Sequence, residues 1–285
     1  MPTLIYGTAW KKEKTRGLVR QALLAGFRGV DTAAQPKHYR EDLVGQGIAD
    51  AMSVGGITRQ ELYIQTKYTS VHGQDRSNMP YDINDSITAQ VHASVQSSLR
   101  HFAPTAESPE QAYVDCLVLH SPFPSQSQTL EAWKAMETHV PQHARTLGIS
   151  NIYHLPALKA LYDFATIKPQ VVQNRFYPES AYDKDIRAFC DEKGMTYQSF
   201  WTLTANPNLL RSEPVSDIAA RVGVTAPVAL YGLVSMLGKV SVLDGTTNVE
   251  RMTEDLNGVR AVRDWLQSGG ADAADAQSTF ERLLE

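Results

Sequence analysis

The chain has 285 residues, with 27 Lys and Arg against 31 Asp and Glu, so its formal net charge is −4. Hydrophobic residues make up 42% and charged residues 20% of the chain, a balance that excludes a disordered or fibrous protein. Nucleic-acid-binding proteins generally need an excess of basic residues to displace counterions, so no nucleic-acid partner is expected. The two cysteines, Cys116 and Cys190, form no C-x-x-C pair and lie in apolar or helical patterns, which is typical of reduced core thiols.

The sequence carries no clear targeting or metal-binding signal. The N-terminus lacks a basic segment followed by an apolar one, and no apolar run approaches the roughly 18 residues of a membrane span. No metal-ligand spacing such as H-E-x-x-H occurs, so no metal site is expected. We therefore expect a cytoplasmic protein without a membrane partner.

Short apolar runs alternate with amphipathic stretches along the whole chain. Strands are predicted over residues 3–7, 27–31, 62–66, 113–119, 146–149, 170–173, 196–200 and 240–243. Helices are predicted over residues 14–26, 41–52, 83–102, 128–138, 155–164, 183–192, 214–222, 226–237, 249–257, 259–266 and 274–284. Eight strand-then-helix units indicate an α/β protein with a closed parallel barrel, the (β/α)₈ TIM barrel. We expect one barrel domain over residues 1–285, with a C-terminal helical tail from about residue 259 and a linker at Gly269-Gly270 and the Ala/Asp stretch behind it.

The alternative fold is an open, doubly wound sheet. If such a sheet bound a dinucleotide, a G-x-G-x-x-G turn would follow an early strand, and none occurs here. Two long connections, over residues 72–80 and 203–213, follow predicted strand ends. In a parallel barrel these connections lie on the face where active sites are built.

Polar side chains stand where three successive strands end. Asp31 ends the second strand, Lys67 the third and His120 the fourth, and Tyr39 lies in the loop after the second. A cation beside a phenol lowers its pKa, which makes a tyrosine a usable general acid, and a nearby histidine can orient a substrate oxygen. Each residue taken alone also fits a structural role: a helix cap, a charge at the rim, a turn cap or a loop aromatic.

The segments around these residues resemble the aldo-keto reductase family over nearly the whole chain. The resemblance rests on Gly7-Thr8-Ala9-Trp10, GFRGVDTA over residues 26–33, Tyr39 with Glu41 and Val44-Gly45, Thr66-Lys67, Leu119-His120, Gly148-Ile149-Ser150-Asn151 and Val171-Val172-Gln173-Asn174. It implies a barrel that binds NADPH without a Rossmann motif and transfers hydride to a small aldehyde or ketone, or from the corresponding alcohol. NADH is expected to be a weaker substitute.

The resemblance also implies a role for each site residue. Tyr39 would donate the proton, Asp31 and Lys67 would tune it, and His120 would orient the carbonyl. The implied cofactor-binding residues are Gly7, Thr8, Ser150, Asn151, Gln173, Phe200, Trp201, Leu203, Gly245, Thr246, Asn248, Arg251 and Asp255. Trp10, His38 and Phe123 would contact the substrate, and their rings favour an apolar or aromatic carbonyl compound.

Three departures from the family pattern bear on the site. Eight positions separate Asp31 from Tyr39 where the family usually has five, so the insert over residues 35–38 must bulge outward for Tyr39 to reach the site. The segment that usually reads Tyr-Ser-Pro-Leu reads FWTL over residues 200–203, which makes Phe200 the ring expected against the nicotinamide. The phosphate segment lacks the usual Lys-Ser pair, and we expect free amides at a helix start, Thr246 and Arg251 to bind the 2′-phosphate instead.

Two other functions remain open on the sequence alone. One is a regulatory module of the same fold that binds the cofactor and turns over little. The other is a barrel enzyme of another class, such as an isomerase of phosphorylated substrates, which would need a carboxylate base in a different arrangement. The set of Asp31, Tyr39, Lys67 and His120 favours the reductase, because a pure binding module needs no tuned acid.

Overall fold

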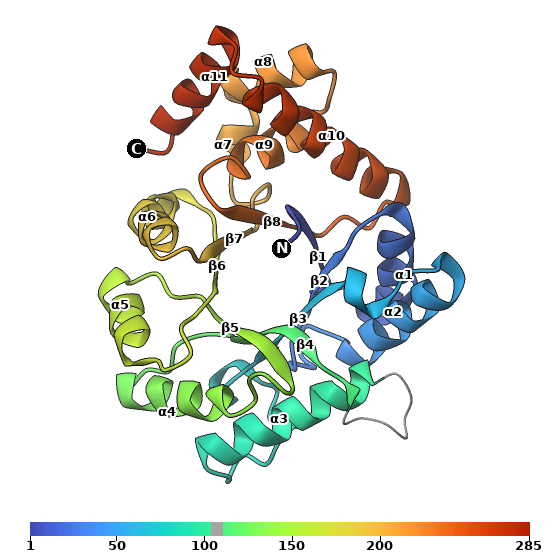
Figure 1. Cartoon of the computed structure of the whole chain (residues 1–285), viewed down its shortest axis with the longest axis vertical. Helices are drawn as coiled ribbons and strands as arrows, with labels where there is room; N and C mark the ends of the chain where they lie inside the picture. Colours follow the sequence, from blue (N-terminus) through green and yellow to red (C-terminus); the bar gives the residue numbers. More distant parts are fainter. Residues whose placement is uncertain (104–110) are drawn as a thin grey trace.

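The computed structural model describes residues 1–103 and 111–285. Its strands are β1 (Leu4–Gly7), β2 (Gly29–Asp31), β3 (Tyr63–Tyr68), β4 (Val114–Leu119), β5 (Ala144–Ser150), β6 (Val171–Arg175), β7 (Thr196–Phe200) and β8 (Val240–Asp244). They pair in parallel and in chain order, and β8 closes on β1 (Figure 1). The predicted (β/α)₈ barrel is therefore confirmed.

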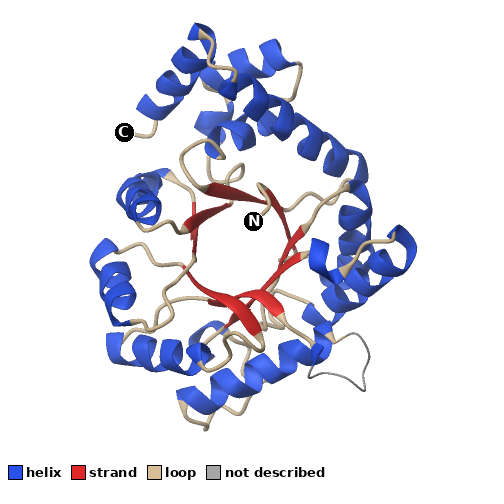
Figure 2. Ribbon diagram, in the orientation of Figure 1, coloured by secondary structure: helices blue, strands red, loops and turns tan. Residues whose placement is uncertain are grey.

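Helices are arranged around the outside of the barrel (Figure 2). They are α1 (Thr15–Ala25), α2 (Glu41–Gly55), α3 (Ile87–Phe102), α4 (Gln126–Glu137), α5 (Leu155–Phe164), α6 (Lys184–Glu192), α7 (Pro207–Leu210), α8 (Glu213–Val222), α9 (Ala226–Val234), α10 (Val249–Gln267) and α11 (Ala271–Arg282). Short 3₁₀ helices span Lys12–Lys14, Arg59–Glu61, Val71–Gly73 and Pro178–Asp183. Helices α7 to α11 gather beside β7 and β8 and thicken the ring there (Figure 1).

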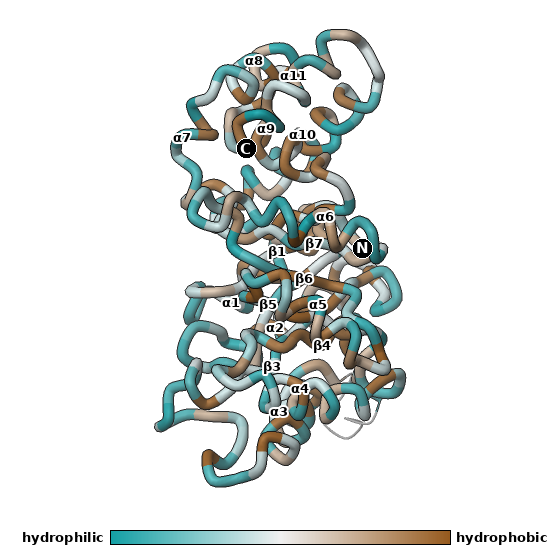
Figure 3. The backbone as a smooth tube through the Cα atoms, turned by 90° about the vertical axis from the view of Figure 1, so that its left-hand side faces the viewer, coloured by the Kyte–Doolittle hydropathy of each residue, from teal (hydrophilic) through white to brown (hydrophobic). Residues whose placement is uncertain are grey.

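The main hydrophobic core lies between the strands and the helices. Hydrophobic segments recur along the strands in the middle of the molecule, and hydrophilic ones along the connecting loops (Figure 3). Inside the barrel, Cys116, Val118 and Val171 form a separate small cluster against Tyr63. Cys116 and Cys190 are both free and buried, as expected for core thiols.

The C-terminal helices differ from the sequence prediction. Residues 249–257 and 259–266 were expected as separate helices, but α10 runs unbroken through both, so the expected tail boundary near 259 falls inside one helix. Gly258 does not end the helix; a Cβ there would lie 2.5 Å from Cγ1 of Val228, so glycine allows α9 to approach closely. The Ala/Asp stretch expected as a linker is helical from Ala271 onward, because α11 packs against α8 and α10.

No single helix among the described residues is long and apolar enough to cross a membrane. Helices α8 and α9 reach that apolar length only together, and they are bent by 107° relative to each other.

Candidate active site

A cavity of about 1270 Å³ opens at the carboxyl ends of the strands. Of the residues expected in the site, those that line it are Gly7, Trp10, Asp31, His38, Tyr39, His120, Phe123, Ser150, Asn151, Gln173, Phe200, Trp201, Leu203, Gly245, Thr246, Arg251 and Asp255. Thr8, Lys67 and Asn248 lie outside the cavity wall. Thr8 is fully buried and donates its hydroxyl hydrogen to the Asp31 carbonyl at 2.8 Å.

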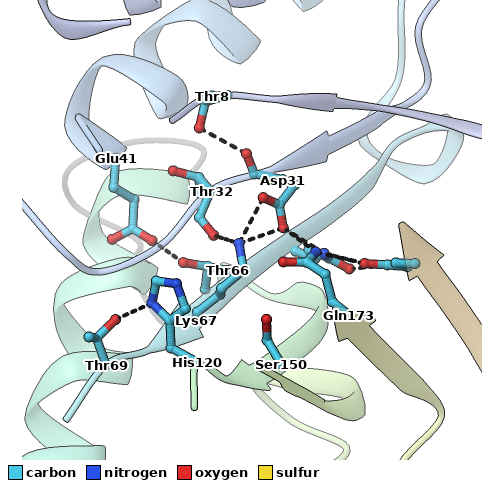
Figure 4. A network of polar contacts seen from close by, with 12 residues as sticks. Thr8, Asp31, Thr32, Glu41, Thr66, Lys67, Thr69, His120, Ser150 and Gln173 are labelled. Carbon is cyan, nitrogen blue, oxygen red and sulfur yellow. Dashed lines mark hydrogen bonds and ion pairs between the residues drawn. The ribbon is translucent and has the colours of Figure 1, made fainter. Parts of the chain in front are cut away.

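Lys67 lies beneath the cavity floor and is ion-paired with Asp31. Its Nζ donates to the two carboxylate oxygens of Asp31 at 2.6 and 2.7 Å and to the Thr32 carbonyl at 2.8 Å (Figure 4). Both side chains are buried. Burial lowers the pKa of Lys67, and the neighbouring Asp31 carboxylate opposes that shift. All three ammonium hydrogens are therefore used within the pair and on the backbone.

Two glutamines complete the surroundings of the Asp31 carboxylate. Gln65 lies opposite Asp31 in the strand register, and its Nε2 donates to Asp31 Oδ1 at 2.6 Å. Gln173 donates from Nε2 to the same oxygen at 3.0 Å, and Gln198, opposite Gln173, accepts from both amides at 2.7 and 2.8 Å. Barrel interiors are usually filled by branched apolar residues, so this polar layer is a particular property of the chain. The sequence analysis did not identify Gln65 or Gln198 as site residues.

The insert between Asp31 and Tyr39 folds into a compact turn. The Gln35 carbonyl accepts from the amides of His38 and Tyr39 at 3.1 and 3.0 Å. The Trp10 amide donates to the His38 carbonyl at 2.8 Å, and the two rings stack with centroids 3.9 Å apart. Tyr39 consequently lines the cavity despite the longer loop.

The Tyr39 ring lies between Lys67 and His120. The Lys67 ammonium is 5.2 Å from the ring centroid, and the His120 ring meets it edge to face at 6.1 Å. Burial, and then the Asp31 carboxylate, raise the pKa of Tyr39 well above its usual range. The expected net lowering of this pKa is not found, because burial and the Asp31 carboxylate dominate and the Lys67 ammonium donates to Asp31 and Thr32 instead of the phenol. Tyr39 is thus held as a protonated phenol.

His120 is neutral and presents one ring nitrogen to the cavity. Burial lowers its pKa to about 3, with smaller contributions from Lys67 and His38. Its Nδ1 lies 2.6 Å from the Thr69 hydroxyl, which has no other acceptor among the described residues (Figure 4). We assign the hydroxyl as the donor, which puts the ring proton on Nε2 as a donor for a substrate oxygen. Thr69 follows β3 directly and carried no sequence signal of its own.

Ser150, Asn151 and Gln173 leave a hydrogen-bonding set that matches a primary amide. Both Nε2 hydrogens of Gln173 are used on Asp31 and Gln198, so its Oε1 remains as an acceptor. The Asn151 side-chain amide donates to the His120 carbonyl and to Ser150 Oγ at 2.8 and 3.2 Å. Its Oδ1 accepts from the Tyr153 hydroxyl at 3.3 Å and keeps a second lone pair as an acceptor. The Ser150 hydroxyl retains its hydrogen. One donor and two acceptors are what a carboxamide requires.

The expected phosphate segment follows β8, but its helix start is already capped. Asn248 accepts from the amides of Glu250 and Arg251 at 2.8 and 3.1 Å, so these two amides of the helix start are not free as expected. Arg251 is exposed and lines the cavity. Lys11, which the sequence analysis did not select, lies buried below this segment and donates to the Gly245 carbonyl at 2.8 Å. Burial lowers the pKa of Lys11 to about 8.

Two carboxylates lie together beside the same segment. Burial raises the pKa of Asp244, and burial together with the Asp244 carboxylate raises the pKa of Asp255 to about 8. Asp244 accepts from the Thr246 amide at 2.9 Å, while its Oδ2 is buried without a partner in the described part of the chain. A shared proton would satisfy that oxygen and reduce the local negative charge.

Glu41 ties the Tyr39 loop to its neighbours. It is the first residue of α2 and is buried, although it carries a carboxylate. It accepts from Thr66 in β3, from Ser98 at 3.0 and 3.1 Å, and lies 3.1 Å from His101 Nδ1 in α3. These contacts fix the start of α2, and with it the chain just after Tyr39; Figure 4 shows the contact between Glu41 and Thr66.

Comparison with known proteins identifies the family. Residues 3–213 match the aldo/keto reductase family. The chain belongs to this family. Membership confirms that it is an oxidoreductase acting on carbonyl groups. The phosphate segment after β8 lies beyond the matched residues.

Several relatives have names or structures that describe them. An NAD/NADP-dependent indole-3-acetaldehyde reductase of Schizosaccharomyces pombe is 29% identical over 276 residues, covering 90% of this chain and 85% of that protein. A glyoxal reductase of Bacillus subtilis is 28% identical over 204 residues, covering 71% of this chain and 63% of that protein. The crystal structure of a Bombyx mori aldo-keto reductase in complex with NADP superposes with a TM-score of 0.70 at 22% identity, covering 93% of this chain and 89% of that one. At this identity the likeness supports the fold alone.

Proposed function

We propose that this protein is an NADPH-dependent carbonyl reductase in which Tyr39 is the general acid. The observation that carries the proposal is that Lys67 pairs with Asp31 and lies over the Tyr39 ring at one cavity, with His120 beside the phenol. The relatives support it, because an NAD/NADP-dependent aldehyde reductase and a glyoxal reductase are among them.

The residues present fit a nicotinamide cofactor. The donor and acceptors of Ser150, Asn151 and Gln173 complement a carboxamide, and Phe200 lines the cavity where a ring could stack on it. A bound reduced nicotinamide supplies the hydride. Arg251 and Thr246 are proposed to bind the 2′-phosphate, since a guanidinium can form two parallel hydrogen bonds to it. Lys11 adds positive charge beneath the same segment.

Side chains of the protein would orient the carbonyl group and donate the proton. His120 Nε2 orients the carbonyl oxygen, and the Tyr39 hydroxyl gives its proton to that oxygen as hydride reaches the carbon. The raised pKa keeps Tyr39 protonated at neutral pH, which suits the reducing direction. Lys67 then stabilises the phenolate through its position over the ring, and Asp31 holds Lys67 in place.

The substrate is proposed to be an apolar or aromatic aldehyde or ketone. Trp10, His38 and Phe123 line the cavity, and Trp10 stacks on His38. Fluorescence titration with NADPH and NADH, followed by a panel of aldehydes and ketones monitored at the reduced-nicotinamide absorbance, tests the proposal. Cofactor binding without any turnover would favour the regulatory module over the reductase.

A further inference from the structure

Arg175 ends β6 on the inward side of the barrel mouth. Gln173 points into the barrel, and Arg175 lies two residues further along the same strand, so it occupies the same face one layer closer to the mouth. It is opposite Phe200 in the register with β7, and it lines the cavity together with Asn151 and Trp201. Neither the family signals nor the proposed mechanism uses this residue.

The Arg175 guanidinium has no carboxylate partner among residues 1–103 and 111–285. By contrast, Arg59 and Arg145 both pair with Asp115, at 2.8 and 3.1 Å. The Nε of Arg175 is buried and has no hydrogen-bond partner in the described chain. A guanidinium keeps its positive charge at any physiological pH, so a half-buried, unpaired cation faces the cavity.

Aromatic rings hold this guanidinium in position. Its Cζ lies 4.1 Å from the ring centroid of Trp201 and 5.3 Å from that of Tyr177. The backbone of Trp201 is in the left-handed region, with φ of 56°, a conformation that residues other than glycine rarely adopt. Stacking uses the faces of the guanidinium and leaves its N–H groups, which lie in the plane, free to donate.

We propose that Arg175 binds an anionic group of a molecule held in the cavity, by paired hydrogen bonds to two oxygens. A carboxylate or a phosphate has the required geometry. The inference rests on the proposed function, because the anion belongs either to the carbonyl substrate or to a phosphate of the dinucleotide. In the first case Arg175 sets the substrate class: carbonyl compounds that carry a carboxylate or a phosphate.

A matched pair of aldehydes separates the two sources. 4-Carboxybenzaldehyde and methyl 4-formylbenzoate share one skeleton, but only the first is anionic. Calorimetry measures the dissociation constant of each with protein saturated in NADP⁺, where no hydride transfer occurs, and the dissociation constant of NADP⁺ itself. The proteins are the wild type, Arg175→Met, Arg175→Lys, and Arg260→Met as a control that removes an exposed charge on α10.

If the anion comes from the substrate, Arg175→Met raises the dissociation constant of 4-carboxybenzaldehyde roughly 10–100-fold, as expected for the loss of hydrogen bonds to a charged group. The dissociation constants of the ester and of NADP⁺ stay unchanged. If the anion comes from the cofactor, the dissociation constant of NADP⁺ rises by a similar factor. The dissociation constants of both aldehydes, measured with protein saturated in NADP⁺, then stay unchanged. Arg175→Lys keeps the charge but loses the two parallel N–H groups of the guanidinium, so it should show a smaller loss of affinity for the same ligand. Arg260→Met should show no loss of affinity.

Several results would overturn the proposal. They are dissociation constants for Arg175→Met all within about twofold of wild type, equal weakening of the acid and its ester, or a wild type that binds neither NADP⁺ nor the acid. The reductase proposal is tested separately by NADPH oxidation with the ester. Absent turnover combined with selective loss of the acid in Arg175→Met would reject the reductase and keep the anion site.

Discussion

Lys67 donates to both carboxylate oxygens of Asp31, at 2.6 and 2.7 Å, although both side chains are buried. A buried ion pair is costly to break, because removing one partner leaves the other charge unpaired in a medium of low dielectric constant. The pair also fixes where the positive charge lies relative to the Tyr39 ring.

The variant Lys67→Met is expected to lose most activity and its alkaline pH dependence. Burial lowers the pKa of Lys67, so in the wild type the ammonium loses its proton, and activity falls, as pH rises into the alkaline range. Without Lys67, Asp31 repels a developing Tyr39 phenolate at every pH. The measurement is kcat/KM from about pH 6 to about pH 10. An alkaline limb identical in wild type and Lys67→Met would contradict the assignment.

The variant Gln65→Met tests the amide layer beneath the site. It removes the 2.6 Å hydrogen bond to Asp31 and leaves Gln198 short of a partner. We expect kcat to fall about 10–100-fold, because a hydrogen bond to a charged group contributes about 1.5–3 kcal/mol, while the dissociation constant of NADPH stays nearly constant. Gln198→Met is the control, since Gln198 touches the glutamines but not Asp31. Equal losses of kcat in both variants would mean that the layer only supports the barrel.

The variant Arg251→Ala tests cofactor selection. Removing a bidentate contact to the 2′-phosphate should raise the dissociation constant of NADPH about 10–100-fold and leave that of NADH nearly unchanged. Arg260→Ala on the same helix is the control, because its side chain is 84% exposed. Fluorescence titrations of both cofactors provide the dissociation constants. Equal weakening of NADPH and NADH would show that Arg251 holds the helix or the adenine.

Gly45→Ala is expected to destabilise the fold by about 1–3 kcal/mol, as overpacking does. A Cβ at Gly45 would lie 1.9 Å from the His101 carbonyl oxygen, so α2 and α3 would have to separate. Gly17→Ala in α1 is the matched control, because no atom of residues 1–103 or 111–285 outside its immediate surroundings lies within 4 Å of its Cβ position. The free energy of unfolding of that variant should rise by about 0.5–1 kcal/mol, because alanine has a better helix propensity than glycine. Urea unfolding of both proteins gives the comparison, and a stable Gly45→Ala would contradict the close helix approach.

Sequence patterns predicted the architecture because parallel strands buried on both faces leave strong signals. The run 113–119 became β4, and Asp31, Lys67 and His120 were found because each is a polar residue at or just after a strand end. The break predicted after Asn257 was wrong, since a glycine in the sequence does not reveal whether it ends a helix or admits a neighbour. Gly258 does the second.

The remaining site residues depend on register, which the sequence does not specify. Gln65 meets Asp31 only because β2 and β3 pair with those two residues opposite each other. Thr69 and Lys11 act through contacts with residues 51 and 234 positions away. Strand alternation from Gln173 could have indicated that Arg175 faces the mouth, but only the three-dimensional structure shows that no described carboxylate pairs with it.

Carbonyl reduction by Tyr39→Phe tests most directly whether Tyr39 is the proton donor. We expect kcat to fall by roughly 10²–10⁴, the usual contribution of general acid catalysis, while the dissociation constant of NADPH stays within about twofold of wild type. Tyr113→Phe is the control, because Tyr113 is not among the residues that line the cavity and its hydroxyl is buried without a partner in the described chain. Near-normal turnover by Tyr39→Phe would contradict the central claim that Tyr39 supplies the proton.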